Sequence, residues 1–165
     1  MKTAQQWIQH LELQQHPEGG WYKETYRSDL KLPAESIAMQ GPRAAATVIY
    51  FLLQGHEKSH FHRIQSDEHW FFHGGSTLNI HILNNNASKE NYRCLPLGPT
   101  HLQQWVPAKQ WFAAELQAPT PEAFALMSCV VAPGFDFADF ALARADALQQ
   151  QYPEHRELVK RLCLN

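Results

Sequence analysis

From Ala44 to Val131 the chain is a succession of short segments typical of β-strands, each bounded by glycine, proline or polar turn residues. The first, residues 46–53, is a nearly continuous run of apolar, β-branched and aromatic side chains. The next two, residues 59–64 and 68–73, alternate in character along the chain. Many short strands at a spacing of roughly 8–12 residues favour a sandwich or barrel over alternating strands and helices. The expected fold class is therefore all-β.

The rest of the chain supplies further strands and, near its ends, helices. Strands are predicted over residues 20–27, 77–83, 91–95, 102–106, 110–116 and 124–131, with a loop over 30–43 and a turn at Asn84-Asn85-Asn86. A helix capped by Thr3 is predicted over residues 3–13, because threonine is a good N-cap residue. Two more helices are predicted over residues 139–151 and 153–164. We expect one domain over residues 1–165. It divides into an N-terminal helix and turn (1–19), the strand region (20–138) and C-terminal helices (139–165).

Composition narrows the possible partners. The formal net charge is −2, and the 14 lysines and arginines are scattered along the chain. A nucleic-acid-binding protein usually carries a basic stripe, and a membrane-spanning helix needs about 20 apolar residues in a row; the sequence has neither. The N-terminus lacks the apolar segment of a signal peptide, and the three cysteines form no metal-type pair. We expect a cytoplasmic protein without nucleic-acid or membrane partners.

Five of the ten histidines lie within residues 56–73, and two of them belong to a pattern framed by glycines. The pattern runs Gly55, His60, His62, Glu68, Gly74. Residues two apart on a strand point to the same face, so both imidazoles are expected to face the barrel interior. A glutamate on the next strand can reach the same point. Two imidazoles and a carboxylate form a facial ligand set for a divalent metal.

This order of residues resembles the first motif of the cupins, in which a glycine, His-x-His, a glutamate and a second glycine follow one another. Residues 16–28, 66–74, 106–114 and 132–140 are together similar to one group, the short single-domain cupin type 5 family of unknown function. The resemblance implies a double-stranded β-helix jelly roll, similar in fold to dTDP-4-dehydrorhamnose 3,5-epimerase, and commonly a homodimer. It implies no established reaction. The early strand with Trp21 and Tyr22 is the expected contact between subunits.

The second cupin motif, which supplies a third histidine, is incomplete. Lys109 stands where the motif has glycine, and Phe112 where it has histidine. His60, His62 and Glu68 could still hold a metal, but a set without the third imidazole binds it less firmly. The cofactor is left open between a divalent metal and none tightly bound, and the missing histidine favours the second.

The predicted site is one pocket inside the barrel. Its catalytic candidates are His60, His62, Glu24 and Tyr26, and its ligand-binding candidates are Glu68, Trp70, Phe72 and Phe112. Burial among apolar side chains would raise the pKa of Glu24 towards that of a general acid or base. A salt bridge from Glu24 to Arg27 or Arg43 is the alternative.

Three functions fit such a pocket. The first is binding of a small polar ligand, carbohydrate- or nucleotide-linked, by an epimerase- or isomerase-like enzyme in which a histidine base and a tyrosine acid, such as His60 and Tyr26, cooperate. The second is a metal-dependent oxygenase or isomerase that uses His60, His62 and Glu68. The third is a small-molecule-binding module without catalysis.

Overall fold

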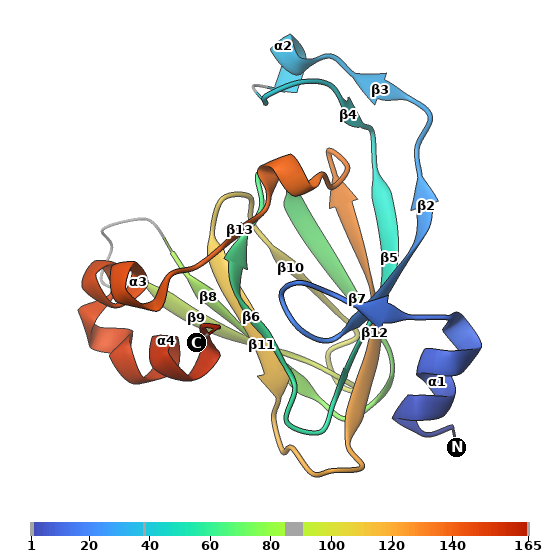
Figure 1. The fold of residues 1–165 in the computed structure, drawn as a ribbon, viewed down its shortest axis with the longest axis vertical. Helices are drawn as coiled ribbons and strands as arrows, with labels where there is room; N and C mark the ends of the chain where they lie inside the picture. The colour runs from blue at the N-terminus through green and yellow to red at the C-terminus, as the bar shows by residue number, and fades with distance from the viewer. Residues whose placement is uncertain (1, 38, 85–90, 165) are drawn as a thin grey trace.

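The computed structural model describes residues 2–37, 39–84 and 91–164. Within these ranges the chain forms two antiparallel β-sheets that face each other as a jelly roll, with helices on opposite sides of the barrel (Figure 1). The predicted fold class is confirmed. Asn85 and Asn86 of the predicted turn lie outside the described residues. In the described part of the chain, no helix is long and apolar enough to cross a membrane.

The larger sheet has the spatial order β1, β2, β5, β12, β7, β10. The bounds of these strands are β1 (Gln14–Gln15), β2 (Trp21–Arg27), β5 (Thr47–Gln54), β12 (Phe124–Ala132), β7 (Asp67–Gly75) and β10 (Gln103–Val106). Strand β12 pairs with β5 on one side and β7 on the other, so strands far apart in sequence become neighbours. This order is expected of a jelly roll, whose connections cross from one sheet to the other.

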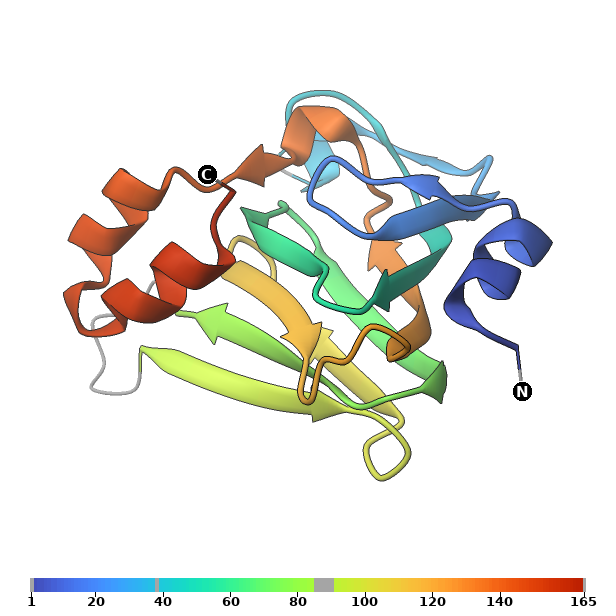
Figure 2. The same ribbon diagram turned by 60° about the horizontal axis from the view of Figure 1, so that its bottom comes forward.

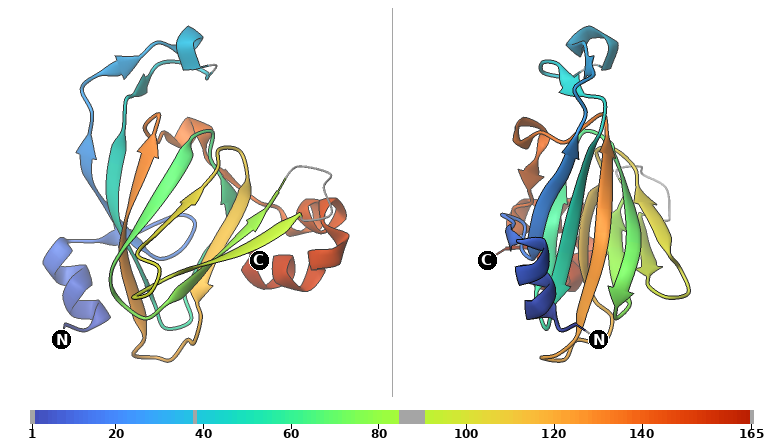
Figure 3. Two further views of the ribbon diagram at one scale, coloured as in Figure 1. Left: turned by 180° about the vertical axis from the view of Figure 1, so that it is seen from behind. Right: turned by 90° about the vertical axis from the view of Figure 1, so that its right-hand side faces the viewer.

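The smaller sheet has the order β13, β6, β11, β8, β9. Its strands are β13 (Ala141–Leu142), β6 (Lys58–Arg63), β11 (Trp111–Leu116), β8 (Leu78–Leu83) and β9 (Tyr92–Leu97). A separate pair, β3 (Lys31–Leu32) and β4 (Arg43–Ala44), continues from β2 and β5 as an arm beyond the end of the barrel (Figure 3).

Helices pack against part of the outer face of each sheet. Helix α1 (Ala4–Leu11) begins at Thr3 as predicted, and Thr3 and Gln6 satisfy each other's backbone N–H groups in a capping box. It packs against the outer face of the larger sheet. Helices α3 (Ala145–Gln151) and α4 (Arg156–Leu162) pack together on the outer face of the smaller sheet (Figure 2).

Several short elements depart from the predicted boundaries. Strand β1 precedes the predicted strand region and β13 follows it, so the C-terminal helical part begins at Ala145 and not at residue 139. The predicted loop over 30–43 contains the short helix α2 (Ala34–Ile37), and 3₁₀ turns occur at η1 (Phe137–Asp139) and η2 (Pro153–His155). Helical structure is therefore not confined to the two ends.

The interior changes in character along the barrel. On β12, Ala125 and Met127 are fully buried in the apolar core, whereas Cys129 and Val131, further along the same inward face, line a cavity. Strands β5 and β7 change in the same way. Burial of each large apolar side chain in the core contributes about 1.5–3 kcal/mol to folding stability. The apolar core therefore stabilises the barrel, including the end that contains the cavity.

Candidate functional site

A cavity of about 280 Å³ lies inside the barrel. Its buried part is lined by Glu18, His62, Glu68, Trp70 and Cys129, and its more exposed part includes Glu24, Arg27, Asp136 and Phe137. Of the eight predicted site residues, four line this cavity: Glu24, His62, Glu68 and Trp70. The other four, His60, Tyr26, Phe72 and Phe112, do not.

A β-bulge in β6 turns His60 away from the cavity. Opposite β11, His62 pairs with Phe112 and Ser59 pairs with Ala114, so three steps along β6 match two along its partner. An extra residue inverts the alternation of side chains, and Ser59 and His62 consequently share the inward face. The His60 Nδ1 lies 3.3 Å from the carbonyl oxygen of Leu162, beside α4. The prediction that both imidazoles face the interior is wrong for His60.

A second bulge, in β2, turns Tyr26 outwards. Glu24 pairs with Ile49 and Tyr26 with Val48, which leaves one extra residue between them. Glu24 and Arg27 therefore face the cavity, while Tyr26 is 53% exposed on the outer face. The prediction of an inward Tyr26 is wrong for the same physical reason as that of His60.

The carboxylate of Glu24 forms the salt bridge that was the alternative to an acid–base role. Arg27 Nη2 and Nε donate to its two oxygens at 2.7 and 2.9 Å. Arg43, the other expected partner, pairs with Asp139 instead. A bidentate guanidinium–carboxylate pair is geometrically specific, so Glu24 fixes Arg27 at the opening of the cavity.

The two phenylalanines predicted to bind ligand lie behind the cavity wall. Phe112 is 1% exposed, and its ring centroid lies 4.0 Å from that of His62 and 6.4 Å from that of Trp70. Phe72 packs against the apolar core. Their placement favours a role in positioning the imidazole and the indole; neither residue lines the cavity, and direct ligand contact by either stays a prediction.

The residue that sequence reasoning missed is Glu18, a buried carboxyl at the centre of the polar contacts. Ser59 Oγ donates to its Oε1 at 2.9 Å, and its Oε2 lies 3.2 Å from His62 Nε2 and 3.3 Å from His16 Nδ1. The signal was present in the segment His16-Pro-Glu-Gly-Gly, which lies between α1 and β2. A buried carboxyl on a loop leaves no strand alternation by which to find it.

The loop that carries Glu18 is held tightly against β6. His60 N donates to the carbonyl of Glu18 at 2.8 Å. Gly19 has φ +102°, and a Cβ there would lie 2.1 Å from the carbonyl oxygen of Lys58. Only glycine combines this backbone conformation with so close an approach, so Gly19 is what lets the loop place a carboxyl inside the barrel.

The hydrogen-bond partners determine where the protons lie around Glu18. His62 Nδ1 must donate to the carbonyl of His60, 2.7 Å away, which leaves Nε2 as an acceptor. His16 Nδ1 accepts the backbone N–H of Glu18 at 3.2 Å and is an acceptor too. Glu18 Oε2 thus faces two acceptor nitrogens, an arrangement that is satisfied when this oxygen carries a proton.

Burial also favours the neutral form of each of these groups. It lowers the pKa of His62 to about 3 and that of His16 to about 4. Burial and the nearby Glu68 raise the pKa of Glu18 well above its usual range. The contacts between Glu18 and the two imidazoles are therefore contacts between neutral groups, and neither is an ion pair.

Glu68 is a second buried carboxyl in the same cavity. Burial raises its pKa to about 7, although the nearby Cys129 thiol and Trp70 indole act in the opposite direction. Glu68 thus changes charge near neutral pH, whereas two acceptor nitrogens beside Oε2 favour the protonated form of Glu18. Two carboxyls in one cavity whose environments differ in this way are the usual sign of distinct acid and base roles.

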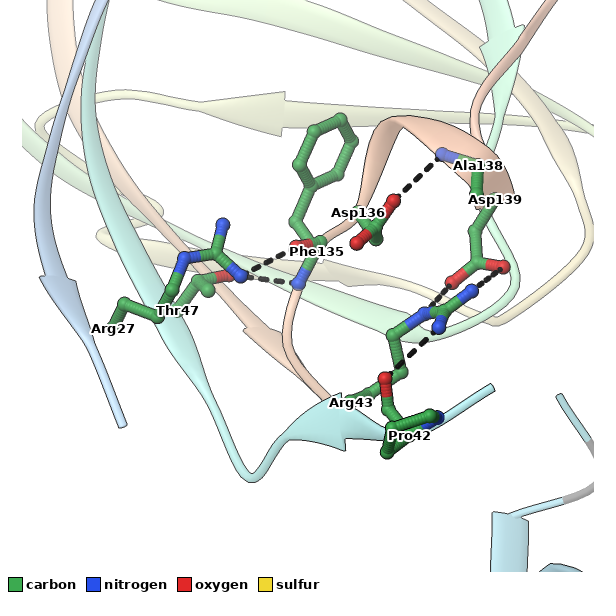
Figure 4. A network of polar contacts seen from close by, with 8 residues as sticks. All are labelled: Arg27, Pro42, Arg43, Thr47, Phe135, Asp136, Ala138 and Asp139. Atoms are coloured by element: carbon green, nitrogen blue, oxygen red, sulfur yellow. Dashed lines mark hydrogen bonds and ion pairs between the residues drawn. The ribbon is translucent and has the colours of Figure 1, made fainter. Parts of the chain in front are cut away.

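An aromatic segment after β12 forms one wall of the cavity. Phe137 is 52% exposed and stacks on His16 with ring centroids 6.0 Å apart. Polar contacts hold this segment in place (Figure 4): Phe135 N–H donates to Thr47 Oγ1, Arg27 donates to the Phe135 carbonyl, and Arg43 forms a bidentate pair with Asp139.

The residues present do not fit the divalent metal that the fold family implies. His60 lies on the far side of β6 from His62 and Glu68, and Phe112 occupies the position of the third imidazole. Among the described residues, no group of three histidine, cysteine, aspartate or glutamate side chains is arranged to hold a metal ion. The predicted set of His60, His62 and Glu68 does not converge.

The jelly roll and its internal cavity define a cupin-type barrel. The model of one family, described as Cupin superfamily (DUF985), matches residues 5–143, and the chain belongs to this family. No curated protein matches the sequence.

Solved structures agree with this assignment. A hypothetical protein from Leishmania major is 34% identical, with a TM-score of 0.88, and the match covers 99% of this chain and 100% of the other. A protein from Shewanella oneidensis is 35% identical, with a TM-score of 0.87 and 99% of both chains covered. Oxalate decarboxylase from Bacillus subtilis shares the fold alone: it is 10% identical, with a TM-score of 0.53 over 90% of this chain and 36% of its own.

Proposed function

We propose that the chain binds a small polar ligand in the barrel cavity and catalyses proton transfer on it, as an epimerase- or isomerase-like enzyme. The observation that carries this proposal is the pair of buried carboxyls, Glu18 and Glu68, in one cavity. General acid–base catalysis is most efficient when the pKa of the catalytic group lies near the operating pH. The pKa of Glu68, about 7, meets this condition.

The two carboxyls take different roles. Glu68, in its ionised form, accepts a proton from the ligand. Glu18 returns one from Oε2, which lies beside the neutral imidazole of His62, while the hydroxyl of Ser59 holds Oε1 and orients the carboxyl. His62 is a positioning residue in this scheme, which replaces the expected pair of His60 and Tyr26.

The test measures exchange of ligand protons with solvent. The protein is incubated in D₂O with a panel of sugars, sugar phosphates and nucleotide-linked sugars, and deuterium incorporation is followed by NMR. We expect exchange on one ligand class, reduced at least about 100-fold in Glu18→Gln and in Glu68→Gln. Glu122→Gln, a change to an exposed carboxyl on a turn, is the matched control and should leave exchange unchanged.

Two outcomes would overturn the proposal. Binding of a ligand without exchange supports the non-catalytic binding module. Exchange or turnover that requires added divalent metal supports the metal-dependent alternative, with ligands other than the predicted set.

We also propose that the chain is a cytoplasmic homodimer. The three cysteines are free thiols, which supports a reducing compartment. The expected contact at Trp21 and Tyr22 does not support a dimer, because both side chains have partners within the same chain. Trp21 donates to Glu57, and the Tyr22 ring lies 4.5 Å from that of His16.

The outer face of the larger sheet is a better candidate for the contact between subunits. The strand registers align one row across five strands, in the order Tyr26, Val48, Val130, His69, Trp105. Its two ends are exposed aromatic side chains, and it contains no acidic or basic side chain apart from the histidine. Depletion of charge together with exposed aromatic residues is typical of protein interfaces. A two-fold axis at β12 would set each end of the row against the other end in the second copy.

A further inference from the structure

The cavity contains a buried polar group that lacks a hydrogen-bond partner within the described residues. It is the indole Nε1 of Trp70, a side chain that is 1% exposed. The indole lies close enough to Glu68 to favour the carboxylate, but it forms no hydrogen bond of ordinary geometry with it. An indole N–H can only donate, and leaving it unpaired in the interior is costly. The unpaired donor therefore points to an acceptor atom on a ligand.

The neighbours of the indole indicate what lies beside that acceptor. Trp70 pairs across the strands with Cys129, and Glu68 pairs with Val131, the next inward position on β12. The indole and the carboxyl thus lie one above the other on the same wall of the cavity. A ligand on this wall meets a fixed donor next to a group that accepts hydrogen bonds when ionised. Adjacent oxygens, one accepting and one carrying a hydroxyl hydrogen, match this pair.

The charges of the cavity limit the charge of the ligand. Arg27 is the cation among the described lining residues, and both Glu24 and the carbonyl of Phe135 already accept from it. An anionic group at the buried end would lie between Glu18 and Glu68 without a free counter-charge. An ammonium group would itself offer no acceptor to the indole, and burying it beside Glu68 would desolvate two charges at a cost that their pairing does not always repay.

We infer that the ligand is an uncharged polyhydroxylated compound, a sugar or sugar-like hydroxycarbonyl, with one oxygen on Trp70 Nε1 and a neighbouring hydroxyl on Glu68. This inference rests on the proposed use of the cavity for a small polar ligand, and it narrows that class to neutral compounds. The volume of about 280 Å³ lies just below the range of roughly 300–1,000 Å³ that is typical of ligand pockets. It suits a single ring better than a nucleotide-linked one.

Three pyranose probes of similar size and different charge test the inference: glucose, glucuronate and glucosamine. The indole N–H resonances of the five tryptophans are followed by ¹H–¹⁵N NMR during each titration. The Trp70 signal is identified by its loss in Trp70→Phe, or by through-bond assignment of the wild type if that variant does not fold. Trp105→Phe, on the outer face of the sheet, is the matched control.

We expect glucose to shift the Trp70 signal and to bind more tightly than either charged probe. Trp70→Phe should weaken glucose binding about tenfold, the effect of one hydrogen bond to a buried donor, and Trp105→Phe should not change it. Tighter binding of glucuronate or of glucosamine, or no shift of the Trp70 signal with any probe, overturns the inference. Because binding is measured without turnover, a failure of deuterium exchange contradicts the proposed catalysis alone.

Discussion

Replacing Glu68 with glutamine should change how the stability of the protein depends on pH. Burial raises the pKa of Glu68 from 4.5 to about 7. Between these values the unfolded chain releases the proton and the folded chain keeps it, so the wild type loses stability as pH rises through this window. One pKa unit corresponds to about 1.36 kcal/mol, and the full loss above pH 7 is therefore about 3 kcal/mol. A neutral glutamine at this position does not titrate and therefore does not cause this loss of stability.

The assay is urea unfolding of both proteins at a series of pH values from 4.5 to 8.5. Glu68→Gln should gain about 3 kcal/mol relative to the wild type between the lowest and the highest pH, whatever constant offset the amide introduces. Titrating groups that do not interact with Glu68 are common to both proteins and cancel in the difference; Glu18, whose pKa Glu68 raises, is the neighbour that does not. Glu122→Gln controls for the loss of one negative charge. A difference that stays constant over the range, or that falls as pH rises, would refute the assignment of Glu68 as a buried acid.

Three further predictions concern the loop, the aromatic wall and the dimer. Gly19→Ala should destabilise the fold by about 1–3 kcal/mol through backbone strain and weaken ligand binding, whereas Gly74→Ala, where a Cβ meets no atom within 4 Å, should not affect binding; urea unfolding and ligand titration measure both. Arg43→Ala should cost about 1–3 kcal/mol, because it leaves the partly buried Asp139 without its partner, and replacing both residues with apolar ones should recover part of the loss. Val130→Glu should convert a dimer to the 19.0-kDa monomer by light scattering, and a wild type that is already monomeric contradicts the proposed interface.

Much of the fold could be predicted because local signals agreed. The strand segments and the glycine-framed pattern both pointed to the same barrel, and the N-cap at Thr3 pointed to the first helix. The site could be predicted only where strand alternation continued unbroken, as it does for Glu68 and Trp70. The prediction failed at His60 and Tyr26, because a bulge in each strand reverses the alternation of side chains beside them. A bulge depends on pairing with a distant strand, which no single strand sequence reveals.

Glu18 was missed for a different reason. It lies on a loop, and the loop's path depends on Gly19 passing against the backbone of β6. The segment His16-Pro-Glu-Gly-Gly indicates a break in the chain, but not that its carboxyl turns inwards. Once Glu18 is in place, the short distances to His16, His62 and Ser59 determine its protonation. Tertiary contact, not local sequence, assigns the chemistry.

Phe112, which stands where the second cupin motif has histidine, also affects the chemistry of His62 in the first motif. Phe112 packs its ring 4.0 Å from the imidazole of His62 and shields it from water, and burial lowers the pKa of His62 to about 3. A neutral imidazole with its Nδ1 hydrogen held by the carbonyl of His60 presents a bare Nε2 to Glu18. That nitrogen helps to keep a proton on the carboxyl. Phe112 therefore has two effects: it stands where a metal-binding histidine would be, and it helps to keep Glu18 protonated. The same substitution thus removes a metal ligand and favours a site suited to proton transfer.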